Sequence, residues 1–331
     1  MYHIEHLLPA QTQKLQIVRQ FLADNGLAWE SGITFTVAIW EKETLVATGS
    51  LEGPVLKCIA VDATVQGQGY TSTVVTQLTN RALEEGYSRL FLYTKPGNEK
   101  LFSSFGFYKI AATPTVVWME NRKNGPQNYI LSKKRADFKG TIGCIVANAN
   151  PFTNGHLHLV KTACRACDFV YLFIVSEDNS VFSFADRFML AQQATKSLEN
   201  LAVVPTDAYM VSAASFPSYF LKDPADAKEV GGELDVAVFV QKIAKPLGIT
   251  RRFVGEEPFS PITAAYNASM LAALPQNGIQ VTVVPRLTQG GVPISATTVR
   301  RLYNARQYKD LAPLIPPTTY QYLVQRGGGH E

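Results

Sequence analysis

The sequence of 331 residues has no long apolar run, and neither sign of charge is in large excess. Because no run reaches the ~18 apolar residues of a membrane-spanning helix, we expect no membrane partner. With a net charge of +4, neither half is basic enough to indicate nucleic acid as the main partner. The first six residues lack the basic and apolar regions of a secretion signal, so we expect a cytoplasmic protein.

Cysteine is scarce, with four residues, and so is histidine, with five. Cys164 and Cys167 have the spacing of a metal or redox motif, but no second cysteine pair exists and no histidine has a matching ligand spacing. Their segment has a helical pattern, in which a spacing of three places both thiols on one face. We therefore expect reduced, buried structural thiols and no metal site made of protein side chains.

Internal repeats and low-complexity tracts are also absent, and 46% hydrophobic with 18% charged residues is typical of a soluble globular protein. A chain of this length predicts two domains. The first part has the strand and turn signals of a mixed α/β domain that contains a hairpin. Its expected strands are 34–39, 45–51, 55–61, 89–93 and 115–119, and its expected helices are 69–85 and 99–105.

The composition changes between residues 120 and 140, where we place the domain junction. Residues 121–126 predict a turn or loop. The basic run at 133–135 predicts a solvated face, with a contact for an acidic partner as the alternative. Beyond the junction, apolar runs alternate with helical segments, which predicts a parallel sheet covered by helices. The expected strands there are 142–146, 169–175, 201–204, 252–254 and 280–284.

The most informative motif follows the first strand of this second part. Pro151 and Asn154-Gly155 indicate a turn, and His156 lies in the first turn of the helix that follows. The free N–H groups of a helix N-terminus attract anions, glycine permits close approach of a phosphate, and an early histidine adds a donor. Since ligands bind at the carboxyl ends of parallel strands, this pattern predicts a phosphate-handling reaction.

A second motif, Ile-Ser-Ala-Thr-Thr-Val-Arg at 294–300, lies far downstream. Ser295 is placed to cap a helix, and Thr297 and Arg300, three residues apart, then lie near one face. An arginine at that place binds phosphate in a bidentate manner. Taken alone, each motif also fits an ordinary capped helix. Together they predict a phosphate site between the turn at 153–156 and Arg300.

The first part has a glycine motif of its own, Gln66-Gly67-Gln68-Gly69, between a strand that ends at Val61 and a helix. Small residues let several backbone N–H groups converge on one anion. An ordinary strand-to-helix turn is the alternative interpretation.

These motifs resemble those of two known families. Thr153-x-Gly155-His156 resembles the (His/Thr)-x-Gly-His signature of nucleotidyltransferases, and residues 294–300 resemble their Ile-Ser-Ser-Thr-x-x-Arg element. The glycine motif resembles the loop of GNAT acetyltransferases that wraps the pyrophosphate of coenzyme A, and residues 101–107 resemble their late Tyr-x-x-x-Gly-Phe segment.

In this order, the two halves resemble the citrate lyase ligase family, as do the stretches 148–156, 216–220 and 255–258. The resemblance implies a GNAT-like domain at 1–130 that binds an acyl or pantetheine group. A junction at 131–140 and a Rossmann-like nucleotidyltransferase domain with a parallel sheet at 141–331 would follow.

The resemblance also implies a two-step reaction. ATP and acetate give acetyl-adenylate and pyrophosphate, and the acetyl group then passes to the thiol of the phosphoribosyl-dephospho-CoA arm on the acyl carrier subunit of citrate lyase. Mg²⁺ is expected with ATP, held largely by phosphates and water. Phe102 stands where many acetyltransferases have a tyrosine that protonates a departing thiolate. Phenylalanine cannot donate a proton, but in this reaction the thiol must attack rather than leave.

The same resemblance assigns roles to single residues. His156 would stabilise the α-phosphate in the transition state, Thr153 would support a phosphate by its hydroxyl, and Arg300 would hold the β- and γ-phosphates. Further ATP contacts are expected from Asn150, Phe152, Gly155, Arg187, Ser295 and Thr297. Contacts to the CoA-like arm are expected from Val61, Gln66, Gly67, Gln68 and Gly69.

Some nearby residues keep two interpretations. His158 lies two residues after His156 and points off another side of the helix, so we expect it to be structural or solvated. The glutamates at 256–257 follow a strand end and would orient ribose or metal, or would simply be exposed. Tyr266 and Asn267 would border the adenine, on resemblance alone.

Two other functions fit the same motifs. One is an adenylyltransferase that acts on a phosphate acceptor such as phosphopantetheine, with a passive first domain. The other is a regulatory module that senses acyl-CoA and has no nucleotide turnover. Dependence of pyrophosphate release on acetate distinguishes the ligase from both.

Overall fold

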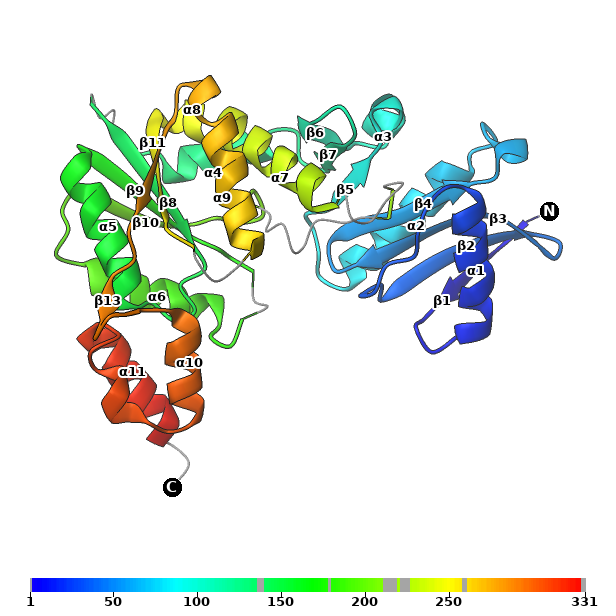
Figure 1. The fold of residues 1–331 in the computed structure, drawn as a ribbon. Coiled ribbons are helices and arrows are strands. Elements are labelled where there is room, and N and C mark those ends of the chain that lie inside the picture. The colour runs from blue at the N-terminus through cyan, green and yellow to red at the C-terminus, as the bar shows by residue number, and fades with distance from the viewer. Residues whose placement is uncertain are drawn as a thin grey trace. The chain divides into compact units, whose positions relative to one another are not determined.

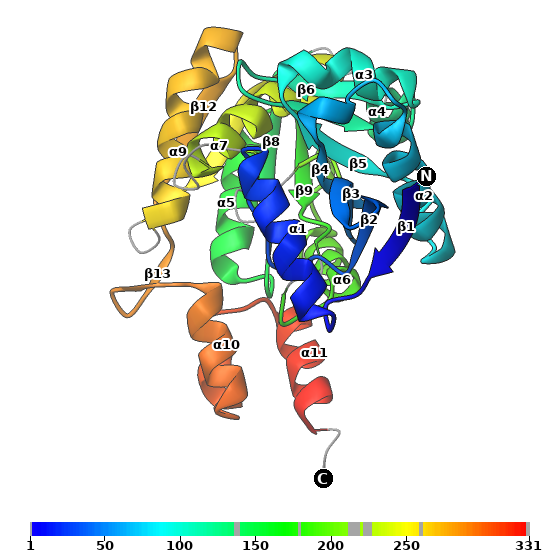
Figure 2. The same ribbon diagram turned by 90° about the vertical axis from the view of Figure 1, so that its right-hand side faces the viewer.

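The computed structural model describes residues 2–135, 140–177, 180–210, 219–220, 227–257 and 261–328. Contacts divide the chain into two compact units, Met1–Asn128 with Val211–Val238 and Tyr129–Met210 with Phe239–Glu331. The predicted junction at 131–140 stays a prediction, and the sequence did not suggest that residues 211–238 return to the first unit. Figures 1 and 2 show the elements of both units in two views.

The first unit is built on a seven-stranded sheet in the order β1-β2-β3-β4-β5-β7-β6. Neighbouring strands are antiparallel except β4 and β5, which run parallel. The strands are β1 (Tyr2–Leu7), β2 (Phe35–Glu41), β3 (Thr44–Glu52), β4 (Val55–Val61), β5 (Phe91–Thr94), β6 (Tyr108–Ala112) and β7 (Val117–Glu120). The helices are α1 (Thr12–Asp24), α2 (Tyr70–Glu84), α3 (Glu99–Ser104) and α7 (Ala227–Val238).

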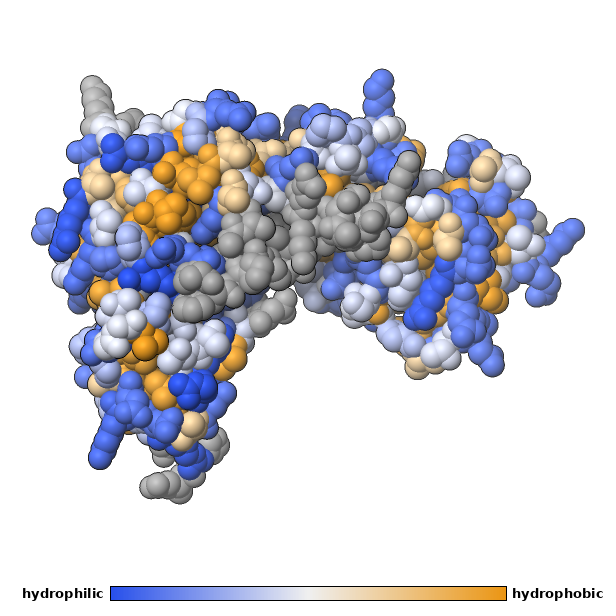
Figure 3. All heavy atoms as spheres, in the orientation of Figure 1, coloured by the Kyte–Doolittle hydropathy of each residue, from blue (hydrophilic) through white to orange (hydrophobic). Residues whose placement is uncertain are grey.

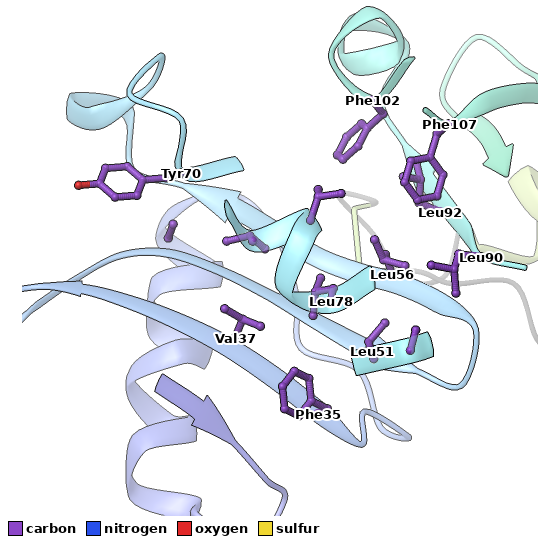
Figure 4. Packing of buried hydrophobic residues seen from close by; sticks show 14 of the residues in the cluster. Phe35, Val37, Leu51, Leu56, Tyr70, Leu78, Leu90, Leu92, Phe102 and Phe107 are labelled. Carbon is purple, nitrogen blue, oxygen red and sulfur yellow. The ribbon is translucent and has the colours of Figure 1, made fainter. Parts of the chain in front are cut away.

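The main core of this unit lies between the sheet and α2. Val74, Val75 and Leu78 of α2 are buried against β2, β3 and β4, because apolar residues recur at helical spacing along one side of the helix. Figure 4 shows Leu78 pointing toward the strands that carry Val37 and Leu51. The predicted hairpin of β2 and β3 is confirmed.

Strands β4 and β5 diverge soon after they begin. They pair only through Val55 with Phe91 and Leu56 with Leu92. Beyond these pairs, the register of β4 against β3 shifts, and Cys58 takes a left-handed backbone conformation with φ of 52°. A bulge bends its strand, so β4 turns away from β5 and the two strands leave a gap.

The second unit holds a five-stranded sheet in the order β10-β9-β8-β11-β12, with every neighbouring pair parallel. The strands are β8 (Ile142–Ala147), β9 (Phe169–Ile174), β10 (Leu201–Pro205), β11 (Ile249–Gly255) and β12 (Gln280–Val284). The helices are α4 (Gly125–Lys133), α5 (Asn154–Ala166), α6 (Phe184–Thr195), α8 (Lys245–Leu247), α9 (Pro261–Ala273), α10 (Ala296–Asn304) and α11 (Pro317–Gly328). This sheet confirms the parallel α/β class predicted for the second part. Its strand order reverses between β8 and β11, where such sheets bind their ligands.

Both faces of the parallel sheet are covered, as its continuous apolar strands predict. Val170, Leu172 and Ile174 of β9 face a core shared with α5 and α6 (Figure 1). Tyr171 points to the opposite face, where its hydroxyl accepts a hydrogen bond from the Arg135 N–H at 3.2 Å. The C-terminal helices α10 and α11 form a separate small core, and they lie side by side in both ribbon views (Figures 1 and 2).

Some elements were not predicted, and one prediction was wrong. β1, α1 and β6 had no expectation. Gln11 at the start of α1 makes no side-chain cap and the first turn carries no acidic residue, so the usual start signals are missing. The predicted loop at 121–126 is wrong at its end, because α4 begins at Gly125. Pro126 fits there, since the missing N–H of a proline costs nothing in the first turn of a helix.

The surface is mixed in character. On the face drawn in Figure 3, apolar side chains gather around α9, where Leu271 is 44% exposed. Among the described residues, no helix is long and apolar enough to span a bilayer. Cys167 is buried, as expected, but Cys164 is only half-buried, and Cys167 lies just beyond the end of α5 rather than on its face.

Candidate active site

A cavity of ≈ 750 Å³ lies in the second unit, at the carboxyl ends of β8, β11 and β12. Its walls come from the start of α5, from the residues that follow β11 and β12, and from the start of α10. Five of the predicted site residues line it, namely Thr153, Gly155, His156, Ser295 and Thr297. The two motifs that lie far apart in the sequence therefore share one cavity.

The first wall is a tightly capped helix N-terminus. Thr153 is the N-cap of α5, and its hydroxyl oxygen accepts from the His156 N–H at 3.3 Å. In return, the Thr153 N–H donates to Nδ1 of the His156 ring at 3.0 Å. A backbone N–H can only donate, so Nδ1 must be an acceptor and the neutral ring carries its proton on Nε2. The ring is thus prepared to donate one hydrogen bond into the cavity.

The imidazole of His156 is held in its neutral form. Burial, together with the positive charge of Arg286, lowers the pKa of His156 to about 4. Burial disfavours the protonated, cationic form of the imidazole, and the nearby guanidinium of Arg286 disfavours that form further. Before an anion binds, His156 therefore acts at neutral pH as a dipole with a fixed donor rather than as an imidazolium.

The second wall is the start of α10. Ser295 caps this helix, with its hydroxyl oxygen accepting from the Thr298 N–H at 3.1 Å. One turn later, Arg300 donates to the Thr297 hydroxyl at 3.0 Å and to the carbonyl oxygen of Asn150 at 2.6 Å. The Arg300 guanidinium therefore ties the loop after β8 to the start of α10. Arg300 itself does not line the cavity, and its contact with ATP stays a prediction.

The two walls also approach each other closely at Gly155. A Cβ atom at this position would lie 3.4 Å from the Ile294 carbonyl oxygen and 3.4 Å from the Thr153 hydroxyl oxygen. A methyl group would only just fit there, and a larger side chain would have to extend over the N-terminal N–H groups of α5, which glycine leaves accessible from the cavity.

Two other predicted ATP contacts, Asn150 and Phe152, do not line the cavity. The Phe152 side chain is fully buried, with its ring 5.5 Å from the His156 ring. The Asn150 side chain is buried and accepts from the Phe182 N–H at 3.2 Å. These positions favour a supporting role for both side chains. Direct contact with ATP stays a prediction for them.

Arg187 is fully buried and does not line the cavity. Its guanidinium donates to the carbonyl oxygens of Asn148, Val175, Phe182 and Glu177 at 2.6–3.1 Å. These contacts join the loops that follow β8 and β9. They favour a role in holding the loops, while the predicted ATP contact of Arg187 stays a prediction.

Residues that sequence reasoning missed also line the cavity. Arg286, which follows β12, donates to the Glu256 carbonyl oxygen at 2.7 Å and to a Glu257 carboxylate oxygen at 2.6 Å. Arg252 of β11 is buried in the wall. A single basic residue near a strand end forms no recognisable motif. The only signal for these two arginines was the parallel topology, because it brings the carboxyl ends of the strands together at one edge of the sheet.

The residues left with two interpretations now have positions. His158, expected to be structural or solvated, lines the cavity and is half-buried. Glu256 and Glu257 line it too, as does Asn267, whose amide donates to the Gly255 carbonyl oxygen at 3.2 Å. Residues 216–218, Pro258 and the Tyr266 side chain lie outside the described residues.

The first unit has a groove of ≈ 380 Å³ in the gap between β4 and β5. Val61, Gln66 and Gly67 of the predicted arm-binding set line it. Gly67 and Gly69 have φ of 82° and 88°, a conformation that suits glycine, and Gly69 is the N-cap of α2. Gln68 and Gly69 do not line the groove, so their contact with an arm stays a prediction.

Phe102 of α3 lines the same groove and is buried. The groove therefore has an apolar ring where the resemblance implies a proton donor. Among the described residues, no group of three histidine, cysteine or carboxylate side chains is placed to hold a metal ion.

Comparisons with known proteins agree with the two-part division. Residues 142–323 match the family described as citrate lyase ligase C-terminal domain, and residues 6–107 match the acetyltransferase (GNAT) family. Over 316 residues the chain is 39% identical to a citrate (pro-3S)-lyase ligase of Klebsiella pneumoniae, covering 94% of this chain and 92% of that protein. The protein of the same name from Escherichia coli strain K12 is 37% identical over 324 residues, covering 95% and 91%. A phosphopantetheine adenylyltransferase of Campylobacter hominis is 37% identical over only 67 residues, covering 20% of this chain and 42% of that protein.

Proposed function

Because this chain belongs to the citrate lyase ligase family, a family with a GNAT-like and a nucleotidyltransferase domain, we propose that it activates acetate as acetyl-adenylate and acetylates a thiol of citrate lyase. One observation carries the proposal for the first step. The capped turn at Thr153–His156 and the start of α10 line one cavity, and Arg300 bridges to the loop before that turn. Both helix N-termini and the guanidinium supply donors for a triphosphate.

In the first step, an acetate oxygen attacks the α-phosphorus of ATP and the bond to pyrophosphate breaks. Acetate alone is a poor acyl donor, because its leaving oxygen is basic. Attachment to AMP supplies a much better leaving group. The site must hold the two reactants in line and stabilise the charge that moves onto pyrophosphate.

Residues of the two walls would contribute to this step in different ways. His156 donates from Nε2 to the α-phosphate, because its Nδ1 is already engaged by the Thr153 N–H. Thr153 and the N–H groups at Gly155 support the same phosphate. Arg300 and the hydroxyls of Ser295 and Thr297 bind the outgoing β- and γ-phosphates. A preorganised donor of this kind contributes ~10²–10³ in rate.

Magnesium accompanies ATP in this proposal and supplies charge neutralisation on the phosphates. The carboxylate of Glu257 is already paired with Arg286, and the described residues offer no carboxylate cage. The ion is therefore bound by phosphates and water, in the way Mg²⁺ binds in many nucleotide sites.

The second step uses the groove of the first unit. The glycine motif binds the pyrophosphate of a dephospho-CoA-type arm, carried by the acyl carrier subunit, and the arm continues between β4 and β5. Its thiol loses a proton and attacks the carbonyl carbon of acetyl-adenylate, and AMP leaves. Buried Phe102 suits this direction, because an attacking thiol needs no proton donor.

Isotope exchange between pyrophosphate and ATP tests the first step. The proposal predicts exchange that requires acetate, and acetylation when thiol-form citrate lyase is added. Exchange without acetate would contradict it. Formation of a dinucleotide from phosphopantetheine would establish the adenylyltransferase instead, and ligand binding without turnover would establish a sensor.

A further inference from the structure

The groove of the first unit has one open end and one closed end. The glycine motif with Gln66 and Gly67 lies at the end where β4 finishes. The opposite end is the point where β4 and β5 still pair, at Leu56 and Leu92. An arm whose pyrophosphate sits at the glycine motif can only run backward along β4, so its thiol must arrive at this closed end.

Two aromatic residues from a distant part of the sequence stand at the closed end. Tyr219 and Phe220 both line the groove, and each is only 5% exposed. Their rings meet edge to face, with centroids 5.0 Å apart. They belong to the segment Val211–Val238, which returns to the first unit from between β10 and β11.

Tyr219 is fixed at the place where the strands part. Its hydroxyl donates to the Tyr93 carbonyl oxygen of β5 at 2.7 Å. Tyr93 directly follows Leu92, the last residue of β5 that pairs with β4. The hydrogen bond from the Tyr219 hydroxyl therefore holds the ring beside the point where the two strands part.

Further contacts fix the main chain of Tyr219. Its carbonyl oxygen accepts from the Ala28 N–H at 2.7 Å, and its N–H donates to a Glu30 carboxylate oxygen at 3.1 Å. Glu30 is in turn bound by the ammonium group of buried Lys57 at 2.7 Å. Burial raises the pKa of the Tyr219 hydroxyl well above its usual range, so it stays protonated and remains a donor. It is therefore a fixed wall rather than a base for the thiol.

We propose that Tyr219 and Phe220 form an end wall that sets how far the thiol of the arm enters the groove and limits the acyl group on it to a short chain. The inference rests on the proposed use of the groove for a pantetheine-type arm. The wall consists of buried apolar surface from Leu56, Leu92 and the two rings. A methyl group gains contacts against such a surface, whereas a longer chain meets rings that cannot move aside without breaking the contacts of Tyr219.

Binding of acyl thioesters to the full chain tests this wall. Isothermal titration is made with dephospho-CoA and with its acetyl, butyryl and hexanoyl thioesters. We expect the hexanoyl form to bind roughly tenfold or more weakly than the acetyl form. Phe220→Ala should bring the affinity for the hexanoyl form close to that for the acetyl form. Such a gain of binding does not arise from misfolding.

Three further variants complete the design. Phe220→Leu, a smaller change, should shift the preference in the same direction by less. Tyr219→Phe keeps the ring and the main-chain contacts but removes the hydroxyl bond to Tyr93, so the preference for short chains should weaken without being lost. Tyr108→Ala removes an exposed aromatic residue that does not line the groove and should change nothing.

The outcomes separate the wall from the proposed function. A native chain that does not bind dephospho-CoA would overturn the use of the groove, and the wall with it. Native binding with equal affinity for acetyl and hexanoyl forms would overturn the wall alone. So would a preference for short chains that survives in both Phe220 variants.

Discussion

Removal of the Nε2 donor of His156, with its other contacts kept, is the sharpest test of the candidate site. An asparagine can place its amide oxygen near the position of Nδ1, where it accepts from the Thr153 N–H that lies 3.0 Å from the ring nitrogen. His156→Asn therefore preserves the cap of α5 and removes only the donor aimed into the cavity. A glutamine places its amide nitrogen near the position of Nε2 instead. His156→Gln therefore keeps a donor to the cavity but removes the acceptor for the Thr153 N–H.

The magnitude follows from the role of a preorganised donor. Loss of one such donor to a developing oxyanion costs ~10²–10³ in rate, or about 2.7–4 kcal/mol. We expect His156→Asn to lose acetate-dependent pyrophosphate exchange by this factor with nearly native stability. His156→Gln should keep more of the rate, but lose about 1 kcal/mol of stability with the cap.

Exchange rates at saturating ATP and acetate, together with urea unfolding, measure both effects. Lys161→Ala, an exposed change one turn further along α5, is the matched control and should leave the exchange rate unaltered. If His156→Asn retains an exchange rate within roughly threefold of the native one, His156 is not the donor described here.

The same residue gives the protein a pH dependence of stability. Because the pKa of His156 is lowered to about 4 from its ordinary 6.5, the unfolded chain binds this proton more tightly than the folded one. Stability should therefore fall as the pH drops from about 6.5 toward 4. At pH 4.5 the loss is at most about 2.5 kcal/mol, and less because the ring partly faces the cavity. The difference in unfolding free energy between pH 7 and 4.5 should shrink in His156→Asn by that amount. An unchanged difference would contradict the neutral, buried ring.

Three other predictions concern the remaining parts. Arg300→Lys should weaken ATP binding by about tenfold, because an ammonium group cannot make the two-pronged contact that joins α10 to the loop after β8. Arg301 is exposed, so Arg301→Lys is the control and should leave the ATP affinity measured by titration unchanged. Gly69→Ala should lower the free energy of unfolding by about 1–2 kcal/mol and should also slow acyl transfer. Gly86 has a similar φ of 90° and no close neighbours either, so Gly86→Ala should lower the stability alone. Equal transfer rates in the two glycine variants would remove the glycine motif from the site. Arg187→Met should lower the free energy of unfolding by roughly 3 kcal/mol or more, since it leaves several buried carbonyl oxygens without donors, and a fully stable variant in urea unfolding would refute its role in holding the loops.

Elements that carry a clear local signal, such as an apolar run or a helix cap, could be predicted from the sequence. β8 is a continuous apolar run and was predicted close to its observed bounds, and Thr153 and Ser295 are strong helix caps, so the starts of α5 and α10 were predicted correctly. The cavity followed because parallel strands bring their carboxyl ends to one edge. α1 escaped prediction, since its stabilisation comes from four buried side chains rather than from caps.

Positions that depend on long-range contacts could not be predicted. No local signal around Arg187 indicates its contacts, and only the folded loops reveal that its donors are spent on carbonyl oxygens. Arg286 carries no motif, yet its charge adds to the burial that lowers the pKa of His156. Tyr219 is distant in sequence from Tyr93, and no periodicity relates a lone tyrosine to a gap between two strands.

The return of Val211–Val238 to the first unit has a consequence for any attempt to separate the halves. A cut near residue 140 yields two fragments, and neither corresponds to a complete folded body. The N-terminal fragment would lack Tyr219, which satisfies the Tyr93 carbonyl oxygen, and the C-terminal fragment would carry buried aromatic residues with nothing to cover them. Exchange of the first unit between relatives would thus have to transplant two stretches of chain together.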